Sequence, residues 1–305
     1  MDNDIREKIS FLTNSKSGIQ NWINIYEFLK NINQKYLTES VNIIRESLDN
    51  NPEWYPFDRY IAPEWYGYIE KGIEDIQLTL IQRANLKGVN FDIERLNNLI
   101  NNKNLWNTKI MELSYCNMDD EQFMLFSEAK NIKNIEELQI DSNQITSEGL
   151  DNFITNDVFS NIEIIDLSYN SISDDGLIKL CKSPYLKNIK ELIINKNEIN
   201  EAGIIELSKC GNFKSLTKLE LDENYIDTDA MIKLVNSKNL NNLEILSINE
   251  CGIDDDVILS IAHSKKLKKL SELYIRNNDY SDETEEELNK AGFEHDDVNN
   301  YWFRN

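Results

Sequence analysis

Two histidines, four cysteines and one run of three aspartates are the residues of this sequence best suited to do chemistry. A histidine beside a serine or cysteine can activate a nucleophile, and clustered carboxylates can hold a metal ion. His263 and His295 have no such partner at the spacing of a catalytic motif, and the sequence contains no phosphate loop, zinc-binding helix or calcium loop. The run Asp254-Asp255-Asp256 falls where a helix is expected to begin, and carboxylates there interact favourably with the helix dipole. No carboxylate has an apolar setting that would raise its pKa, so we expect no enzyme, no metal site and no cofactor.

The cysteines favour a reducing compartment. They are far apart and show no C-x-x-C spacing, which is typical neither of a disulfide framework nor of a zinc site. The first ten residues, MDNDIREKIS, are polar and predict no signal peptide, and no long apolar run predicts a membrane span. We therefore expect a cytoplasmic protein. The four cysteines are Cys116, Cys181, Cys210 and Cys251.

The chain is strongly acidic, with 54 aspartates and glutamates, 32 lysines and arginines, and a formal net charge of −22. Such a charge repels the phosphates of nucleic acids and of anionic membranes, so neither is expected as a partner. It favours a protein partner with a basic surface.

A repeat of 27 residues determines where these side chains can lie. The stretch IEELQIDSNQI at 135–145 returns 27 residues later as IEIIDLSYNSI, and the pattern L-x-x-L-x-L-x-x-N-x-L occurs in eight units, the first of them degenerate. Such self-similarity is the signature of a solenoid, in which each unit packs on its neighbours. The units contain the stretches 81–91, 108–118, 135–145, 162–172, 189–199, 216–226, 243–253 and 270–280.

The pattern resembles the leucine-rich repeat family, of the ribonuclease-inhibitor-like type and of bacterial origin, over residues 81–280. The resemblance implies an α/β solenoid: a curved horseshoe with a parallel sheet on its concave face and helices on its convex face. The uniform 27 residues are slightly shorter than is typical of that type. Proteins of this type often bind globular partners through the concave face, which is what the resemblance implies for function.

Alternation within each unit separates core positions from outward ones. In 135–145, Leu138 and Ile140 are expected to point inward and Glu137 and Asp141 outward, as alternate residues of a strand do. The second half of each unit, as in 173–188, predicts a full helix. The ninth position carries asparagine or cysteine, which we expect to form a buried structural ladder between units. The ladder residues are Cys116, Asn143, Asn170, Asn197, Asn224, Cys251 and Asn278.

Acidic side chains are concentrated at the outward positions of the expected strands. Over seven units, these 28 positions carry ten acidic and three basic residues. The helical segments, 96 residues in all, carry 16 acidic and 13 basic residues. Together with tyrosines and isoleucines they predict a protein-binding concave face. The alternative is a solvated sheet face whose acids serve solubility. The candidate partner-binding residues are Glu112, Tyr115, Glu137, Asp141, Asp166, Tyr169, Glu191, Glu220, Asp222, Glu223, Glu250 and Tyr274.

Segments outside the repeat are expected to cap it at both ends. Residues 1–80 predict a helical, aromatic-rich N-terminal subdomain. Its aromatic stretch PEWYPFDRYIAPEWYGY, 52–68, is expected to plug the exposed core of the first unit, with a ligand site as the alternative. Residues 281–305 predict an acidic C-terminal cap and tail that ends in three aromatic residues. The alternative for this segment is a secretion or docking signal.

Two helices are expected in the N-terminal subdomain. The helix at 18–33 should bury one stripe of apolar side chains. The helix at 37–48 should begin at Thr38 as its cap. The stripe consists of Ile19, Trp22, Ile23, Tyr26 and Leu29.

The sequence as a whole predicts a monomeric, non-catalytic scaffold that binds a partner protein through its acidic concave face. The main alternative is a bacterial effector that is secreted into a host cell without a signal peptide and binds a host protein through the same face. An enzyme of unrecognised type in residues 1–80 and a structural spacer without a partner are further alternatives.

Overall fold

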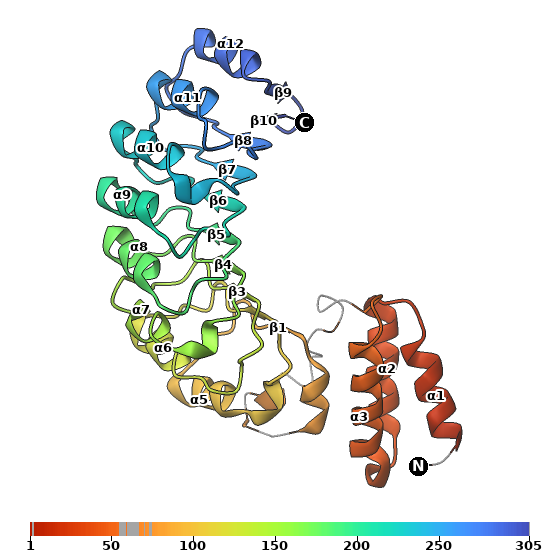
Figure 1. The fold of residues 1–305 in the computed structure, drawn as a ribbon. Helices are drawn as coiled ribbons and strands as arrows, with labels where there is room; N and C mark the ends of the chain where they lie inside the picture. The colour runs from red at the N-terminus through yellow and green to blue at the C-terminus, as the bar shows by residue number, and fades with distance from the viewer. Residues whose placement is uncertain (2, 55–58, 60–66, 70, 73–74, 305) are drawn as a thin grey trace.

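The structure is a computed structural model of the 305-residue chain. Figure 1 shows a curved solenoid in which short strands line the inner side and helices cover the outer side, with the helices of residues 3–49 bundled beside its N-terminal end. This arrangement confirms the predicted α/β leucine-rich-repeat solenoid. The described residues are 1, 3–54, 59, 67–69, 71–72 and 75–304.

Eight parallel strands form the inner sheet in chain order, and a C-terminal hairpin extends it. Each parallel register pair joins residues 27 positions apart, as in Arg83↔Ile110 and Leu192↔Leu219. The central residue of each of these eight strands is buried, so its two neighbours face outward. The strands are β1 (Arg83–Asn85), β2 (Ile110–Glu112), β3 (Glu137–Gln139), β4 (Ile164–Asp166), β5 (Glu191–Ile193), β6 (Lys218–Glu220), β7 (Ile245–Ser247), β8 (Glu272–Tyr274), β9 (Glu294–Asp296) and β10 (Tyr301–Phe303).

Helical segments connect the strands on the outer side. The predicted full helix is wrong in two units, because α6 has only seven residues and α7 only four. Phe123, Phe126, Phe153 and Phe159 fill that part of the core, with neighbouring ring centroids between 4.6 and 6.1 Å apart. The helices are α1 (Asn3–Thr13), α2 (Ile19–Asn31), α3 (Gln34–Asp49), η2 (Ile76–Leu80), α5 (Ile93–Asn101), η3 (Lys103–Leu105), α6 (Asp120–Phe126), α7 (Leu150–Phe153), η4 (Asp157–Phe159), α8 (Ser173–Lys182), α9 (Glu201–Lys209), α10 (Thr228–Val235), η5 (Lys238–Leu240), α11 (Asp255–Ala262) and α12 (Asp282–Lys290).

The N-terminal bundle differs from its prediction in two details. In α2, Trp22, Tyr26 and Leu29 are buried, but Ile19 and Ile23 are exposed, because α1 packs mainly along α3 and leaves this side of α2 uncovered.

The start of α3 is the second difference. Thr38 lies inside the helix and does not cap it. The helix begins four residues earlier, where the side chain of Asn33 accepts a hydrogen bond from the backbone N–H of Lys35. Asparagine caps a helix at least as well as threonine, so the earlier residue sets the boundary.

Arg59 closes the N-terminal end of the sheet. Its backbone carbonyl accepts hydrogen bonds from the N–H groups of Gln82 and Arg83 at 2.9 and 3.0 Å, the same pair of bonds that each later unit receives from the one before. Its fully buried guanidinium donates to the carbonyl of Leu80 and forms an ion pair with Asp49 at the end of α3. One residue therefore joins the bundle to the first strand.

Trp54 is the described tryptophan of the aromatic stretch 52–68, and Trp65 lies outside the described residues. The side chain of Trp54 is 4% exposed, and its ring centroid lies 6.4 Å from that of Trp22 in α2. Its indole N–H donates to the carbonyl of Ser15 at 3.1 Å. These contacts lie within the helical bundle, so the plug hypothesis for the first unit stays a prediction.

The C-terminal segment ends the sheet as a β-hairpin. Strand β10 pairs antiparallel with both β8 and β9, and Trp302 is buried opposite Leu273. The backbone N–H of Arg304 donates to the carbonyl of Ser271 and continues the backbone hydrogen bonding of the sheet. The part of the chain predicted as a polar tail is thus folded, and residues 281–304 cover the last repeat.

Candidate binding face of the inner sheet

Each repeat has four outward positions on the concave face, two in its strand and two in the turn that follows. The last of the four has a left-handed backbone in every unit, with φ between 49° and 57° for the seven non-glycine residues and 76° for the glycine. Its N–H donates to the next unit, as from Tyr169 to the carbonyl of Asn195 at 2.8 Å, which fixes where each side chain leaves the backbone. We call these residues the rim column: Gly88, Tyr115, Ser142, Tyr169, Lys196, Glu223, Glu250 and Asn277.

The structure places most of the predicted partner-binding residues at least partly in solvent on this face. Tyr115 is 59% exposed and Tyr169 is 47% exposed. Glu250 is also exposed, and Tyr274 is half-buried. The remaining acids are half-buried: Glu137, Asp141, Asp166, Glu191, Glu220, Asp222 and Glu223.

Glu112 is the exception and corrects the prediction. It is only 5% exposed, and its carboxylate forms an ion pair with Arg83 at 2.5 Å. Arg83 belongs to β1 in the degenerate first unit. Because its charge is already balanced at a covered position, Glu112 is not available to a partner.

Two of the predicted acids hold neighbouring units together. Asp222 accepts hydrogen bonds from the hydroxyl of Ser247 at 2.7 Å and from the backbone N–H of Asn249 at 2.8 Å. Asp141 accepts a hydrogen bond from the hydroxyl of Ser114 in the preceding unit. A substitution at either aspartate would therefore change the turn structure as well as the charge.

Glu223 is neutralised within the face itself. It forms an ion pair with Lys196 at 2.8 Å and accepts a hydrogen bond from the Tyr169 hydroxyl at 3.0 Å. These two groups hold the pKa of Glu223 below its ordinary value, and Glu223 in turn raises the pKa of both Lys196 and Tyr169. Glu223 is therefore ionised at neutral pH, but contributes little net charge to the surface.

Asp166 contradicts the expectation that no acid has a raised pKa. Burial raises the pKa of Asp166, and the negative charges of Asp141 and Glu220 add to the effect. Asp166 lies in register with Ile193 of the next strand, and its carboxylate accepts a hydrogen bond from the backbone N–H of Ser168 at 2.9 Å. The alternation pattern could not show this, because the burial comes from neighbouring units.

The predicted structural ladder is built from asparagine side chains. The amide N–H of Asn224 donates to the carbonyls of Ile194 and Leu221, at 3.0 and 2.9 Å. Its oxygen accepts from the N–H groups of Asn197 and Ile199. Equivalent bonds are made by Asn143, Asn170, Asn197 and Asn278.

The two cysteines of the ladder donate in place of asparagine. The thiol of Cys116 lies 3.2 Å from the carbonyl of Leu86, and that of Cys251 lies 3.1 Å from the carbonyl of Leu221. Burial raises the pKa of Cys116 to about 11 and that of Cys251 to about 12. Both thiols therefore stay protonated at neutral pH and are poor nucleophiles.

Replacing Asn224 with alanine is expected to lower the free energy of unfolding by about 3 kcal/mol, because several buried backbone groups lose their partners at once. Chemical denaturation followed by circular dichroism measures this loss. The matched control is Asn289→Ala at an exposed position of α12, where the cost should stay below about 1 kcal/mol. Equal effects of the two substitutions would contradict the structural role of the ladder.

A second asparagine column was missed by the sequence analysis. Asn134, Asn161, Asn188 and Asn242 each donate a side-chain hydrogen bond of 2.8 Å to a backbone carbonyl of the preceding unit. Asparagines spaced by multiples of 27 residues just before the strands were the available signal. Much of the asparagine content of the chain thus serves the stacking of units.

The aspartate run begins α11, as expected. Asp254 caps the helix by accepting from the N–H of Val257, and Asp255 lies in the first turn. Asp255 also accepts hydrogen bonds from the Thr284 hydroxyl and the Ser281 N–H, which lower its pKa. Among the described residues, no group of three His, Cys, Asp or Glu side chains is arranged to hold a metal ion.

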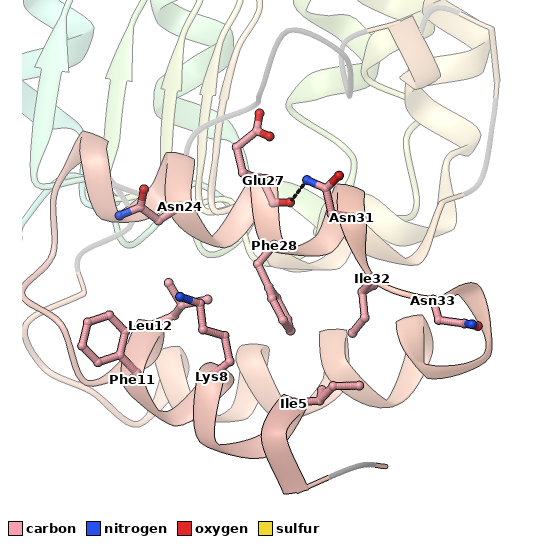
Figure 2. A pocket seen from close by; sticks show the side chains of 10 residues that line it. All are labelled: Ile5, Lys8, Phe11, Leu12, Asn24, Glu27, Phe28, Asn31, Ile32 and Asn33. Atoms are coloured by element: carbon pink, nitrogen blue, oxygen red, sulfur yellow. Dashed lines mark hydrogen bonds between the residues drawn. The ribbon is translucent and has the colours of Figure 1, made fainter.

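A hollow of about 660 Å³ lies between α1 and α2, away from the sheet. Figure 2 shows Phe28 and Ile32 pointing from the side of α2 toward Ile5 on α1. Phe11, which also lines this hollow, is 69% exposed. This hollow was not predicted from the sequence.

Comparisons with known proteins agree with the repeat. The family model described as Leucine Rich repeat matches residues 131–153 and 160–181. The chain is similar to an internalin from Listeria monocytogenes, with 20% identity over 70% of this chain and 67% of that chain, and a TM-score of 0.46. It is also similar to a chain of the yeast Rad7 and Elc1 complex, with 15% identity, 90% and 85% coverage, and a TM-score of 0.39. A comparison with curated proteins found no match.

The family match falls within the solenoid, which has the leucine-rich-repeat fold. Proteins with this fold generally mediate protein–protein interactions, and the fold is typically a scaffold rather than a catalyst. In the described parts of the chain, none of the helices is long and apolar enough to cross a membrane.

Proposed function

We propose that the protein is a non-catalytic scaffold that binds a partner protein with a basic surface through its concave face. The observation that carries this proposal is the charge of that face. Its outward positions in seven units hold ten acidic and three basic residues, and of the ten acids only Glu112 is buried. Acidic and basic residues are nearly equal in number on the helical side, so the concave face has the more negative electrostatic potential.

The shape and composition of the face favour a protein over a small ligand. Eight strands about 4.8 Å apart give a sheet roughly 34 Å across, which can hold a globular partner. Half-buried isoleucines such as Ile164 and Ile245 share this face with the exposed tyrosines Tyr115 and Tyr169. Mixed apolar, aromatic and charged groups are typical of protein interfaces.

Charge reversal of three outward acids, Glu137→Lys, Glu191→Lys and Glu250→Lys, is expected to abolish capture of the partner at physiological salt. These positions avoid the aspartates that hold the turns together. The measurement is affinity capture from the native lysate with the immobilised protein, followed by mass spectrometry.

The matched control reverses three acids outside the concave face, Glu128→Lys, Glu206→Lys and Glu286→Lys. This variant has the same net charge as the first and is expected to capture the partner as the wild type does. Equal capture by both variants would count against the concave face as the binding site.

We also propose a cytoplasmic location. Cys116, Cys181, Cys210 and Cys251 are all free thiols, and the Sγ of Cys210 lies 3.6 Å from the carbonyl oxygen of Cys181. Free cysteines are typical of proteins in a reducing compartment. The secreted-effector alternative uses the same face. The secreted-effector alternative rests on the acidic C-terminal segment, which is folded into the cap through residue 304. Cell fractionation of the tagged full-length chain tests the location.

A further inference from the structure

The hollow between α1 and α2 is an apolar surface that the helical bundle leaves uncovered. Leu12 is buried beneath it, but Ile5, Phe28 and Ile32, which also line it, are only partly buried. Phe11 lines the same hollow and presents most of its ring to solvent. Large apolar side chains that gather at one concave place on the surface mark an interaction site.

The two helices that form the hollow are electrically neutral. Helix α1 carries two acidic and two basic residues, and α2 carries one of each. The whole chain has a formal net charge of −22, so two copies of it repel each other across most of their surfaces. A second copy can approach this neutral pair of helices without that local repulsion.

One cation and one anion stand on opposite walls of the hollow. Lys8 on α1 and Glu27 on α2 both line it and are both exposed, and neither forms an ion pair with another described residue. The Nζ of Lys8 lies 5.5 Å from the ring centroid of Phe11, and Figure 2 shows the carboxylate of Glu27 directed away from α1. A two-fold axis brings the same surface of both copies together, so Lys8 of each copy can face Glu27 of the other. The charges of this surface are therefore complementary to themselves.

We propose that the protein forms a homodimer in which α1 of each copy lies in the hollow of the other. Phe11 of one copy packs against Phe28 and Ile32 of the other, and Lys8 pairs with Glu27 in both directions. Each α1 then contacts its own α2 and that of the second copy, as neighbouring helices do in a four-helix bundle. The hollow lies away from the inner sheet, so this dimer and the proposed binding of a partner through the concave face do not depend on each other. The sequence alone predicted a monomer, because the uncovered hollow is formed by the packing of the helices.

Sedimentation equilibrium of the full-length protein over a range of concentrations measures the dimer. Contact through two pairs of short helices gives a small interface, so we expect a Kd of about 10–100 μM. A wild type that stays monomeric at about 300 μM, well above this Kd, would overturn the proposal.

Exchange of the two charges tests the arrangement. Lys8→Glu and Glu27→Lys are each expected to weaken dimerisation about tenfold or more, because two attractive pairs become repulsive at once. An equal mixture of the two variants should dimerise as the wild type does, because each pair across the mixed dimer again joins opposite charges. The double variant Lys8→Glu/Glu27→Lys should also dimerise as the wild type does.

Removal of the exposed ring tests the apolar contact. Phe11→Ser is expected to weaken dimerisation about tenfold or more, as the loss of an aromatic contact residue usually does. The matched control is Ile19→Ser, which removes an apolar side chain of α2 that is 66% exposed and outside the hollow, and which should leave the Kd unchanged. All the substituted side chains are exposed, and circular dichroism checks that the variants are folded.

Three outcomes would show that any dimer uses another surface, and each overturns the proposal. The first is a dimer that neither Lys8→Glu nor Glu27→Lys weakens. The second is a mixture of these two variants that stays monomeric. The third is an equal loss of dimerisation in Phe11→Ser and Ile19→Ser. None of them bears on the concave face, which is tested by its own charge reversals.

Discussion

Trp54→Ala is expected to lower the free energy of unfolding by about 3–5 kcal/mol, the usual cost of removing a buried aromatic side chain. Trp54 is 4% exposed, packs against Trp22 in α2 and donates to the carbonyl of Ser15 between α1 and α2. Its removal leaves a cavity and an unpaired carbonyl where the chain leaves the bundle. Urea denaturation followed by circular dichroism measures the effect.

The matched control is Trp106→Ala. Trp106 is 41% exposed, and the guanidinium of Arg45 in α3 lies 5.6 Å from its ring centroid. Its loss should cost about 1 kcal/mol or less. If Trp54→Ala is as mild as this control, the plug hypothesis for the aromatic stretch is wrong and a ligand role gains support.

Asp49→Ala is expected to lower the free energy of unfolding by about 3 kcal/mol, because it leaves the charge of Arg59 buried without its partner. Arg59 is fully buried, whereas the side chain of Asp49 is 36% exposed. Burial lowers the pKa of Arg59, and Asp49 opposes that shift. Water that enters at the exposed side limits the loss, so the expected value lies at the low end of the range for buried ion pairs.

The double variant Asp49→Ala/Arg59→Met tests the cause of this loss. Methionine fills much of the space of arginine without its charge, so the double variant should be more stable than Asp49→Ala alone. Thermal unfolding of the three proteins gives the comparison. A double variant that is less stable than Asp49→Ala would show that Arg59 acts through its bond to the carbonyl of Leu80, not through charge compensation.

The register of the strands, though not their length of three residues, could be predicted to the residue because the repeat allows only one register. A slip of one residue would turn Leu219 and Leu246 to solvent, and a fixed 27-residue phase excludes any other shift. The structure pairs these two residues as the sequence implies. The ladder was equally visible, since asparagine at the ninth position has a single structural use in stacked units.

Other features depend on contacts that no local pattern encodes. The left-handed rim column was missed because Tyr115, Lys196 and Glu223 share no chemical property that marks such a backbone. Glu112 was misassigned because its partner, Arg83, stands in a unit with little of the repeat pattern. The closing role of Arg59 depends on a carbonyl that faces a strand more than twenty residues later.

The C-terminal hairpin had a signal that was not used. Asn299 and Asn300 precede the strand-forming run Tyr-Trp-Phe, and Asn300 adopts φ 55° in the turn. Asparagine in a left-handed turn before aromatic residues favours a hairpin.

The most direct test of the binding face is site-specific photocrosslinking to the captured partner. One variant carries a photoreactive amino acid in place of Ile245, which faces the concave side in β7. The other carries it in place of Lys233, an exposed residue of α10 on the convex side. We expect the partner to crosslink from position 245 and not from position 233. Crosslinking from position 233 alone would contradict binding through the acidic concave face.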